Sequence, residues 1–245
     1  MMITTAAVVI GGLAAIPAAV AGVVYARSSK ATLAFFNPVD GGGSWLDDAN
    51  DGLGEPLNVV ISGFSSPAVL TDDGIVNYAR AMGFSEECFG IHLGDPQSAN
   101  LGDGNGWVNQ TMELRQDFGL AGIGTCFETL LGGNHFRVYR QNGPKANSGA
   151  LFLAVSKEED LSQGHTIIPD GYNLGRDALA EAVMGTTHFG GVTYTTRVER
   201  MLNLAPAGTI GVNHDISVDG TVILLTVTIA LIDCMSLPTL RSTLR

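Results

Sequence analysis

The sequence feature that most constrains the fold lies near the C-terminus. Thr221–Ile232 (TVILLTVTIALI) runs for twelve residues without a charge. At roughly 1.5 Å per residue, a helix of this length is too short to cross the ~30 Å hydrocarbon core of a bilayer. Its β-branched side chains suit a pleated surface better than a helix. We therefore expect this run to be a buried, central strand of a sheet.

Shorter runs with strand character surround it in the sequence. Alternating or continuous apolar patterns predict five further strands, at Leu57–Ile61, Phe89–Leu93, His135–Arg140, Ala150–Ser156 and Gly190–Val198. The third and fourth of these are separated by the strong turn residues Asn142–Pro144.

Helical spacing of apolar residues alternates with these strands. It predicts helices over Val69–Met82, Thr125–Leu131 and Asn173–Met184. We expect Ser65–Pro67 to start the first helix, and Thr125 with Glu128 to form a capping box in the second. The pattern as a whole predicts an α+β fold, a mixed, mostly antiparallel sheet of about six strands with two or three helices packed against it.

The N-terminus carries a separate apolar segment. Ala6–Tyr25 is a stretch of twenty residues without a charge, and the first cations, Arg27 and Lys30, follow it. We interpret residues 1–26 as a signal peptide or an N-terminal membrane anchor, and a buried core helix is the alternative. The positive-inside rule taken alone would place the main domain in the cytosol, but it is weak for long domains. Contact with a membrane is expected only through residues 6–25, if they are not cleaved.

The rest of the chain is expected to form one domain after a linker. Residues 27–56 are rich in Gly, Asp and Asn, as in Asp40–Gly43 and Asp47–Gly52, and are predicted to be a flexible linker. Residues 57–245 then form a single domain.

Two features support a secreted or extracytoplasmic location. Asn109–Gln110–Thr111 is an N-glycosylation sequon in a Gly/Asn-rich stretch that we expect to be an exposed loop. A disulfide between Cys88 and Cys126 would close a long loop and contribute roughly 3–4 kcal/mol in the chain-entropy model. Three buried free thiols are the alternative, and a bridge would leave Cys234 over.

The overall charge limits the partners. The chain has 13 basic and 24 acidic residues, a net charge of −11. Nucleic acid requires a basic surface to displace its counterions, so we expect no nucleic-acid partner. A small molecule or a cell-surface ligand is compatible with this charge.

Histidines and charged residues suggest one candidate site. If the strands pair, His135, His165 and Asp170 can converge as catalytic residues, with Arg137, Arg176 and Asp177 as ligand-binding residues beside them. Imidazole and carboxylate also suit a zinc or iron site, but the spacing does not identify a metal or another cofactor. The structural alternative is that the histidines bridge loops, and that Arg176 pairs with Asp170 or Asp177 to hold the start of the helix.

Searches for known catalytic motifs are negative. The sequence contains no G-x-S-x-G elbow, P-loop, HExxH motif, CxxC pair or dinucleotide-binding glycine fingerprint.

Three segments resemble a known family. They are Glu55–Gly63 (EPLNVVISG), His135–Arg140 (HFRVYR), and His165–Asp170 (HTIIPD) with Gly175–Asp177 (GRD). Over Pro56 to Ile232 the chain resembles the LssY-like C-terminal domain, and it looks most like the small secretory-pathway versions of mushroom-forming fungi. In bacteria this domain often follows a membrane lipid phosphatase, whose signature motifs are missing from this sequence. The resemblance implies that His135, Arg137, His165, Asp170, Arg176 and Asp177 match the family pattern, and it carries no reaction.

Two functional hypotheses follow. In the first, the chain is a secreted or membrane-anchored domain that binds a ligand or partner without catalysis. In the second, it is a hydrolase or lyase, metal-assisted or not, built on His135, His165 and Asp170 with Arg176 clamping an anion. Convergence of the three catalytic candidates in an open pocket would favour the second hypothesis.

Overall fold

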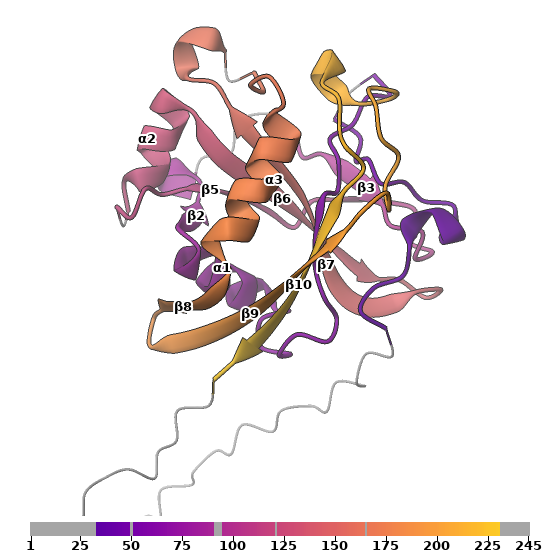
Figure 1. Cartoon of the computed structure of the whole chain (residues 1–245), viewed down its shortest axis with the longest axis horizontal. Coiled ribbons are helices and arrows are strands. Elements are labelled where there is room, and N and C mark those ends of the chain that lie inside the picture. The colour runs from indigo at the N-terminus through magenta and orange to yellow at the C-terminus, as the bar shows by residue number, and fades with distance from the viewer. Residues whose placement is uncertain (1–32, 50, 91–94, 121, 165, 231–245) are drawn as a thin grey trace, which may run out of the picture.

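A curled mixed sheet of eight strands organises the fold (Figure 1). The computed structural model describes residues 33–49, 51–90, 95–120, 122–164 and 166–230. Strand order in the sheet is β2-β5-β6-β7-β1-β10-β9-β8, and β3 pairs with β4 in a separate small sheet. The strands are β1 (Val59–Ile61), β2 (Phe84–Glu86), β3 (Ser98–Asn100), β4 (Trp107–Asn109), β5 (Met112–Gln116), β6 (Gly133–Asn142), β7 (Asn147–Glu158), β8 (Gly185–Phe189), β9 (Val192–Met201) and β10 (Val222–Ile229).

The expected fold class is confirmed, but the strand count is wrong. Among the described strands, β1 and β10 form a parallel pair and the other neighbours are antiparallel. The additional strands have three to five residues, and β4 and β8 are largely exposed, so neither has a clear apolar pattern. The prediction of a strand at Phe89–Leu93 is wrong for Phe89 and Gly90. These two residues belong to a 3-10 turn, Cys88–Gly90, in which Phe89 has φ 54°. Its remaining residues lie outside the described part.

The three expected helices are present, with different starts. They are α1 (Asp72–Ala81), α2 (Gly124–Leu131) and α3 (Gly171–Ala182). Thr71 caps α1 by accepting a hydrogen bond from the Gly74 amide at 3.0 Å, so the helix starts later than Ser65–Pro67 suggested. The capping box expected in α2 is wrong, because Ile123 occupies the cap position and the Glu128 carboxylate contacts Arg115 instead.

One face of the sheet carries the main apolar core together with α1 and α3. Alternate residues of β6 and β7, such as Phe136 and Val155, pack there with Ile75 of α1 and Leu179 of α3. Helix α1 also contacts β2 and β8, the two edge strands of the sheet. Helices α1 and α3 therefore cover one face and leave the other to loops and to α2.

The segment before β1 covers the opposite face, which corrects the expectation of a flexible linker. Trp45 is 2% exposed and its ring lies 5.8 Å from that of Phe152 on β7. Leu57, Val60 and Leu101 belong to the same apolar cluster. A buried tryptophan anchors the segment in spite of its turn-rich composition, so residues 33–49 and 51–56 belong to the folded domain.

The disulfide between Cys88 and Cys126 is confirmed, and it joins the turn after β2 to α2. This bond is compatible with an extracellular location. No helix within the described residues is long and apolar enough to span a bilayer. The apolar segment 6–25 and Cys234 lie outside the described residues.

Candidate functional site

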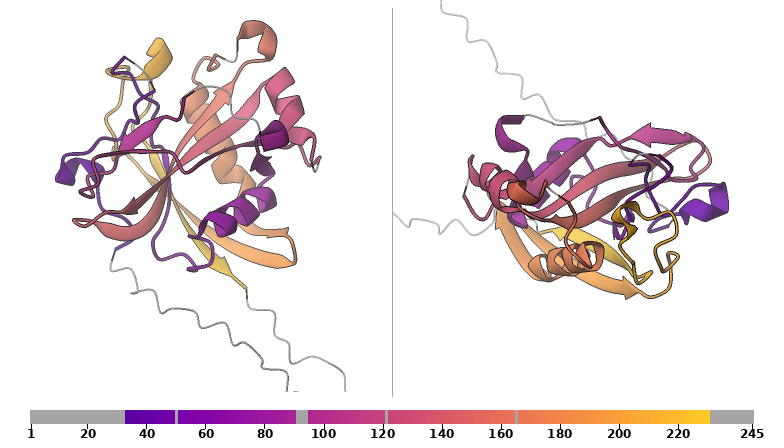
Figure 2. Two further views of the ribbon diagram at one scale, coloured as in Figure 1. Left: turned by 180° about the vertical axis from the view of Figure 1, so that it is seen from behind. Right: turned by 90° about the horizontal axis from the view of Figure 1, so that it is seen from above.

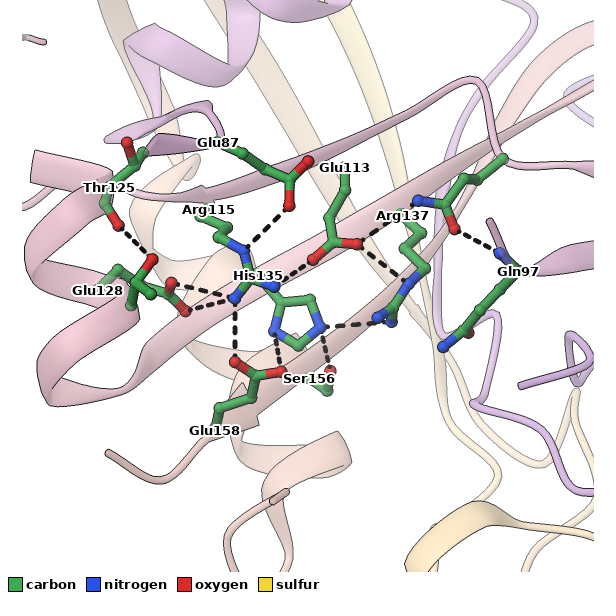
Figure 3. A network of polar contacts seen from close by, with 12 residues as sticks. Glu87, Gln97, Glu113, Arg115, Thr125, Glu128, His135, Arg137, Ser156 and Glu158 are labelled. Atoms are coloured by element: carbon green, nitrogen blue, oxygen red, sulfur yellow. Dashed lines mark hydrogen bonds and ion pairs between the residues drawn. The ribbon is translucent and has the colours of Figure 1, made fainter. Parts of the chain in front are cut away.

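Alternating residues place a row of charges on the loop-covered face of β5, β6 and β7. The register sets Arg115 opposite His135, and His135 opposite Ser156, while Glu113 faces Arg137. Residues of the other parity, such as Phe136, point into the main core. A two-residue repeat on three neighbouring strands thus brings charged side chains together in the interior (Figure 3).

Arg115 is one centre of this network. Its Nη2 lies 2.6 Å from Glu113, and its Nη1 lies 3.1 Å from Glu128 and 3.0 Å from Glu158. Its Nε is 3.6 Å from Glu87 (Figure 3). A single guanidinium therefore faces four carboxylates, three from β5, α2 and β7 and one from the residue that follows β2.

Arg137 is the second centre, and Glu113 connects it to Arg115. Arg137 Nη1 lies 2.8 Å from Glu55 and its Nε lies 3.3 Å from Glu113. Further along the same face, the Tyr139 hydroxyl donates to Asp47 at 2.9 Å. The segment before β1 thus contributes two of the buried carboxylates.

His135 lies between the two arginines and is fully buried. Its Nε2 is 3.1 Å from Ser156 Oγ and 3.4 Å from Arg137 Nη1, and its Nδ1 is 3.6 Å from Glu158. An arginine can only donate hydrogen bonds, so these partners assign Nε2 as the acceptor and place the ring proton on Nδ1, facing Glu158.

The network contains more acid than base. Among the residues that the structure describes, six acidic side chains lie in the network with two arginines, Arg115 and Arg137; they are Asp47, Glu55, Glu87, Glu113, Glu128 and Glu158. Burial raises the pKa of Glu128 to about 7, against the opposing effect of Arg115 and with a further rise from Glu158. Burial also raises the pKa of Asp47 to about 7, and the neighbouring charge of Glu55 adds to the rise. Chemically, such a site can hold protons or a cation.

The contacts of Ser156, His135 and Glu158 follow the order of a hydrolytic triad. Hydrolysis further requires that a substrate carbonyl reach the serine oxygen. Ser156 has no exposed surface, and it lines none of the three described cavities. The arrangement therefore lacks the access that acyl transfer needs.

A separate cleft of about 330 Å³ lies between the segment before β1 and the loop that precedes β10. Figures 1 and 2 show these two segments side by side. The apolar lining comprises Val39, Trp45, Leu46, Pro56, Leu57, Ala205, Pro206, Ala207, Ile210, Val212 and Val218. The Asn58 amide also lines the cleft, but it is used internally, by Val155 and by the Tyr172 carbonyl. Most of the wall is therefore apolar.

Arg176 lies at this cleft and ties two elements together. Its guanidinium binds Asp219 through both Nη atoms, at 2.6 and 3.0 Å, and the Thr221 carbonyl at 3.0 Å. Its Nε donates to Asp177 at 2.9 Å. Through Asp219 and Thr221, Arg176 thus fastens α3 to the segment that leads into β10. Its contact with Asp177 is one of the two that the structural alternative expected.

The residues expected to form one site occupy different places. His135 and Arg137 belong to the buried network, whereas Arg176 and Asp177 belong to the cleft side of α3. Asp170 is exposed just before α3 and accepts a hydrogen bond from Asn173. His165 lies outside the described residues, and Asn109 is exposed on β4, as a glycosylation site requires.

Sequence reasoning missed most residues of the buried network around His135. The missed residues are Asp47, Glu55, Glu87, Glu113, Arg115, Glu128, Ser156 and Glu158. The available signal was the two-residue spacing of Glu113 with Arg115 and of Ser156 with Glu158, which matches that of His135 with Arg137. Three strands that carry polar or charged side chains at the same two-residue spacing predict one shared polar face.

Comparisons with known proteins add no relative. The chain matches no protein-family model, no curated protein and no solved structure. The resemblance to the LssY-like domain therefore stays a prediction.

Proposed function

We propose that this chain is an extracytoplasmic domain, secreted or held at a membrane by residues 6–25, that binds an uncharged and mainly apolar small molecule. The observation that carries the proposal is the cleft of about 330 Å³ with its apolar walls. Small-molecule sites are concave, largely apolar and usually preformed, with volumes of roughly 300–1,000 Å³. The disulfide and the exposed sequon at Asn109 support the location outside the cytosol.

The polar groups of the cleft favour an uncharged ligand over an anion. Arg176 is the cation that lines it, and Asp219 and Asp177 already engage its guanidinium. A bound anion would have to compete for the guanidinium with two carboxylates that already contact it. The two asparagines in the wall, Asn58 and Asn173, also have internal partners. Affinity is therefore expected to come from apolar contact.

Binding is favoured over the second hypothesis of hydrolysis. Hydrolysis would use the contacts among Ser156, His135 and Glu158, which lie within the buried network. The cleft opens to solvent along Ile210, which is 94% exposed, and Ser156 does not line it. The proposed ligand cleft and the side chains that hydrolysis would use thus lie in different parts of the molecule.

A fluorescence titration tests the proposal. The full chain is titrated with N-phenyl-1-naphthylamine, an uncharged probe whose emission rises in apolar surroundings. We expect saturable binding, and we expect Ala207→Trp to abolish it by filling the cleft. Ala68→Trp, at an exposed position outside the cleft, is the matched control and should bind as the wild type does. Equal binding by both variants would refute the cleft as the site.

A further inference from the structure

Three side chains that can bind a metal meet at one end of the buried network. Glu128 comes from α2, His135 from β6 and Glu158 from β7, and their ligand atoms all lie within 4.8 Å of one another. Glu128 and His135 have no exposed surface, and Glu158 is 9% exposed. Three donors from three elements therefore converge on one point that is shielded from water (Figure 3).

The charge around this point also calls for a cation. Among the described residues, the network brings six acidic side chains together with two arginines, and a nearby cation stabilises a buried carboxylate. A divalent ion would neutralise two of the excess carboxylates at once. One imidazole with two carboxylates is a donor set for first-row transition ions, whereas Ca²⁺ and Mg²⁺ prefer oxygen ligands throughout.

We propose that Glu128, His135 and Glu158 form a binding site for a divalent transition-metal ion, of which Zn²⁺ is the representative.

The scaffold holds these three donors in place. Cys126 precedes Glu128 by two residues, and its disulfide to Cys88 fixes α2 against the turn after β2. A methyl group at Gly133 would lie 2.7 Å from Glu128 Cγ, so the glycine leaves the space that this side chain fills. Both strand residues are held by the β6–β7 register. Donors fixed in advance lose little freedom on binding.

Neighbouring groups can adjust to the ion. Arg115 Nη1 now touches both carboxylates, and Arg115 also contacts Glu113 and Glu87, which can keep it when an ion takes the other two. With Nδ1 on the ion, the neutral ring moves its proton to Nε2 and donates it to Ser156 Oγ at 3.1 Å, and Arg137 Nη1 then donates to Glu55 at 2.8 Å and no longer to Nε2. The serine proton can then point to Glu55, 3.4 Å away.

An acidic cavity gives the ion a route. A cavity of about 280 Å³ lies beside α2, and its lining includes Glu86, Glu87 and Asp117 together with Arg80. Arg80 pairs with Glu86 at 2.9 Å, so Glu87 and Asp117 give the cavity its excess of acid. Glu87 contacts Arg115, which in turn contacts Glu128 and Glu158. A cation attracted to this cavity is therefore one residue away from the proposed ligands.

Calorimetry with ZnCl₂ on the untagged, metal-stripped full chain tests the site. We expect one Zn²⁺ per chain and a higher melting temperature with Zn²⁺ than with EDTA, and no such rise with Mg²⁺. Glu158→Gln and His135→Gln should weaken Zn²⁺ binding by more than about tenfold. Loss of a group that only supports a metal ligand already costs about tenfold or more in affinity, so loss of a ligand should cost at least as much. His188→Ala and Glu199→Gln alter residues of the same types elsewhere on the chain and should leave binding unchanged.

A second measurement covers variants that fail to fold. The wild type is loaded with Co²⁺, and its visible absorption and paramagnetically shifted proton signals are recorded. We expect shifted signals from one imidazole that are insensitive to His188→Ala. Absence of stoichiometric Zn²⁺ binding, binding lost in His188→Ala, or binding unchanged in Glu158→Gln would overturn the proposal.

Discussion

Replacing Arg176 by methionine is expected to lower the free energy of unfolding by about 2–4 kcal/mol. The buried Thr221 carbonyl loses its charged partner, which costs about 1–3 kcal/mol. Asp219 and Asp177 are 46% and 38% exposed at their side chains, so water compensates most of their loss. Each of these partly exposed pairs accounts for at most about 1 kcal/mol. Methionine keeps the packing of the arginine stem, so the change isolates the guanidinium.

Urea denaturation followed by tryptophan fluorescence measures this loss. Trp45 is 2% exposed and lines the same cleft as Arg176, so its emission reports on this region. Arg197→Met removes an arginine that is 72% exposed and paired with Glu199, and it should change stability by less than about 0.5 kcal/mol. If Arg176→Met cost no more than this control, the view that Arg176 fastens α3 to β10 would be wrong.

Three further outcomes are expected. Replacing Cys88 and Cys126 together by alanine removes a bond across 38 residues and should cost about 4 kcal/mol in urea denaturation, and an unchanged midpoint would contradict this. The folded state raises the pKa of Asp47 to about 7, chiefly through burial, so it binds a proton that the unfolded chain has released. The contribution of Asp47 is thus fully present below pH ~4 and is lost as the pH rises through about 7, and Asp47→Asn should flatten the decline measured in urea midpoints. Parallel slopes in wild type and variant would refute that assignment. Expression in a eukaryotic secretory host should add a glycan at Asn109 that glycosidase treatment removes, and intact masses of wild type and Asn109→Gln that differ only by the methylene of the substitution would contradict it.

The sequence predicted the long, strongly patterned elements and the fully buried β1, and it missed the other short strands. The run of β10 and the alternation in β6 identified central strands because their side chains must be buried. Strands β5 and β8 could not be recognised, because each has only five residues and β8 is largely exposed. The segment before β1 was wrongly predicted to be a flexible linker for another reason. Burial of the single side chain of Trp45 holds it in the fold in spite of the turn residues around it.

The candidate site was harder to predict than the fold. His135 and Arg137 were both expected in the site, and they are in contact in the structure. The structural alternative paired Arg176 with Asp170 or Asp177, and Arg176 contacts Asp177. Joining them into one site required knowing which strands pair and which face each residue occupies. Partners from distant segments, such as Glu55 and Glu128, become visible only when the chain is folded.

Amide chemical-shift mapping tests the central proposal most directly. The ¹⁵N-labelled chain is titrated with N-phenyl-1-naphthylamine, and its backbone amide signals are followed. We expect the largest shifts at residues that line the cleft, namely Ala205, Ala207, Gly208, Val218, Gly220 and Thr221. Shifts centred instead on the exposed apolar residues of α2, such as Leu130 and Leu131, would contradict the assignment of the cleft as the binding site.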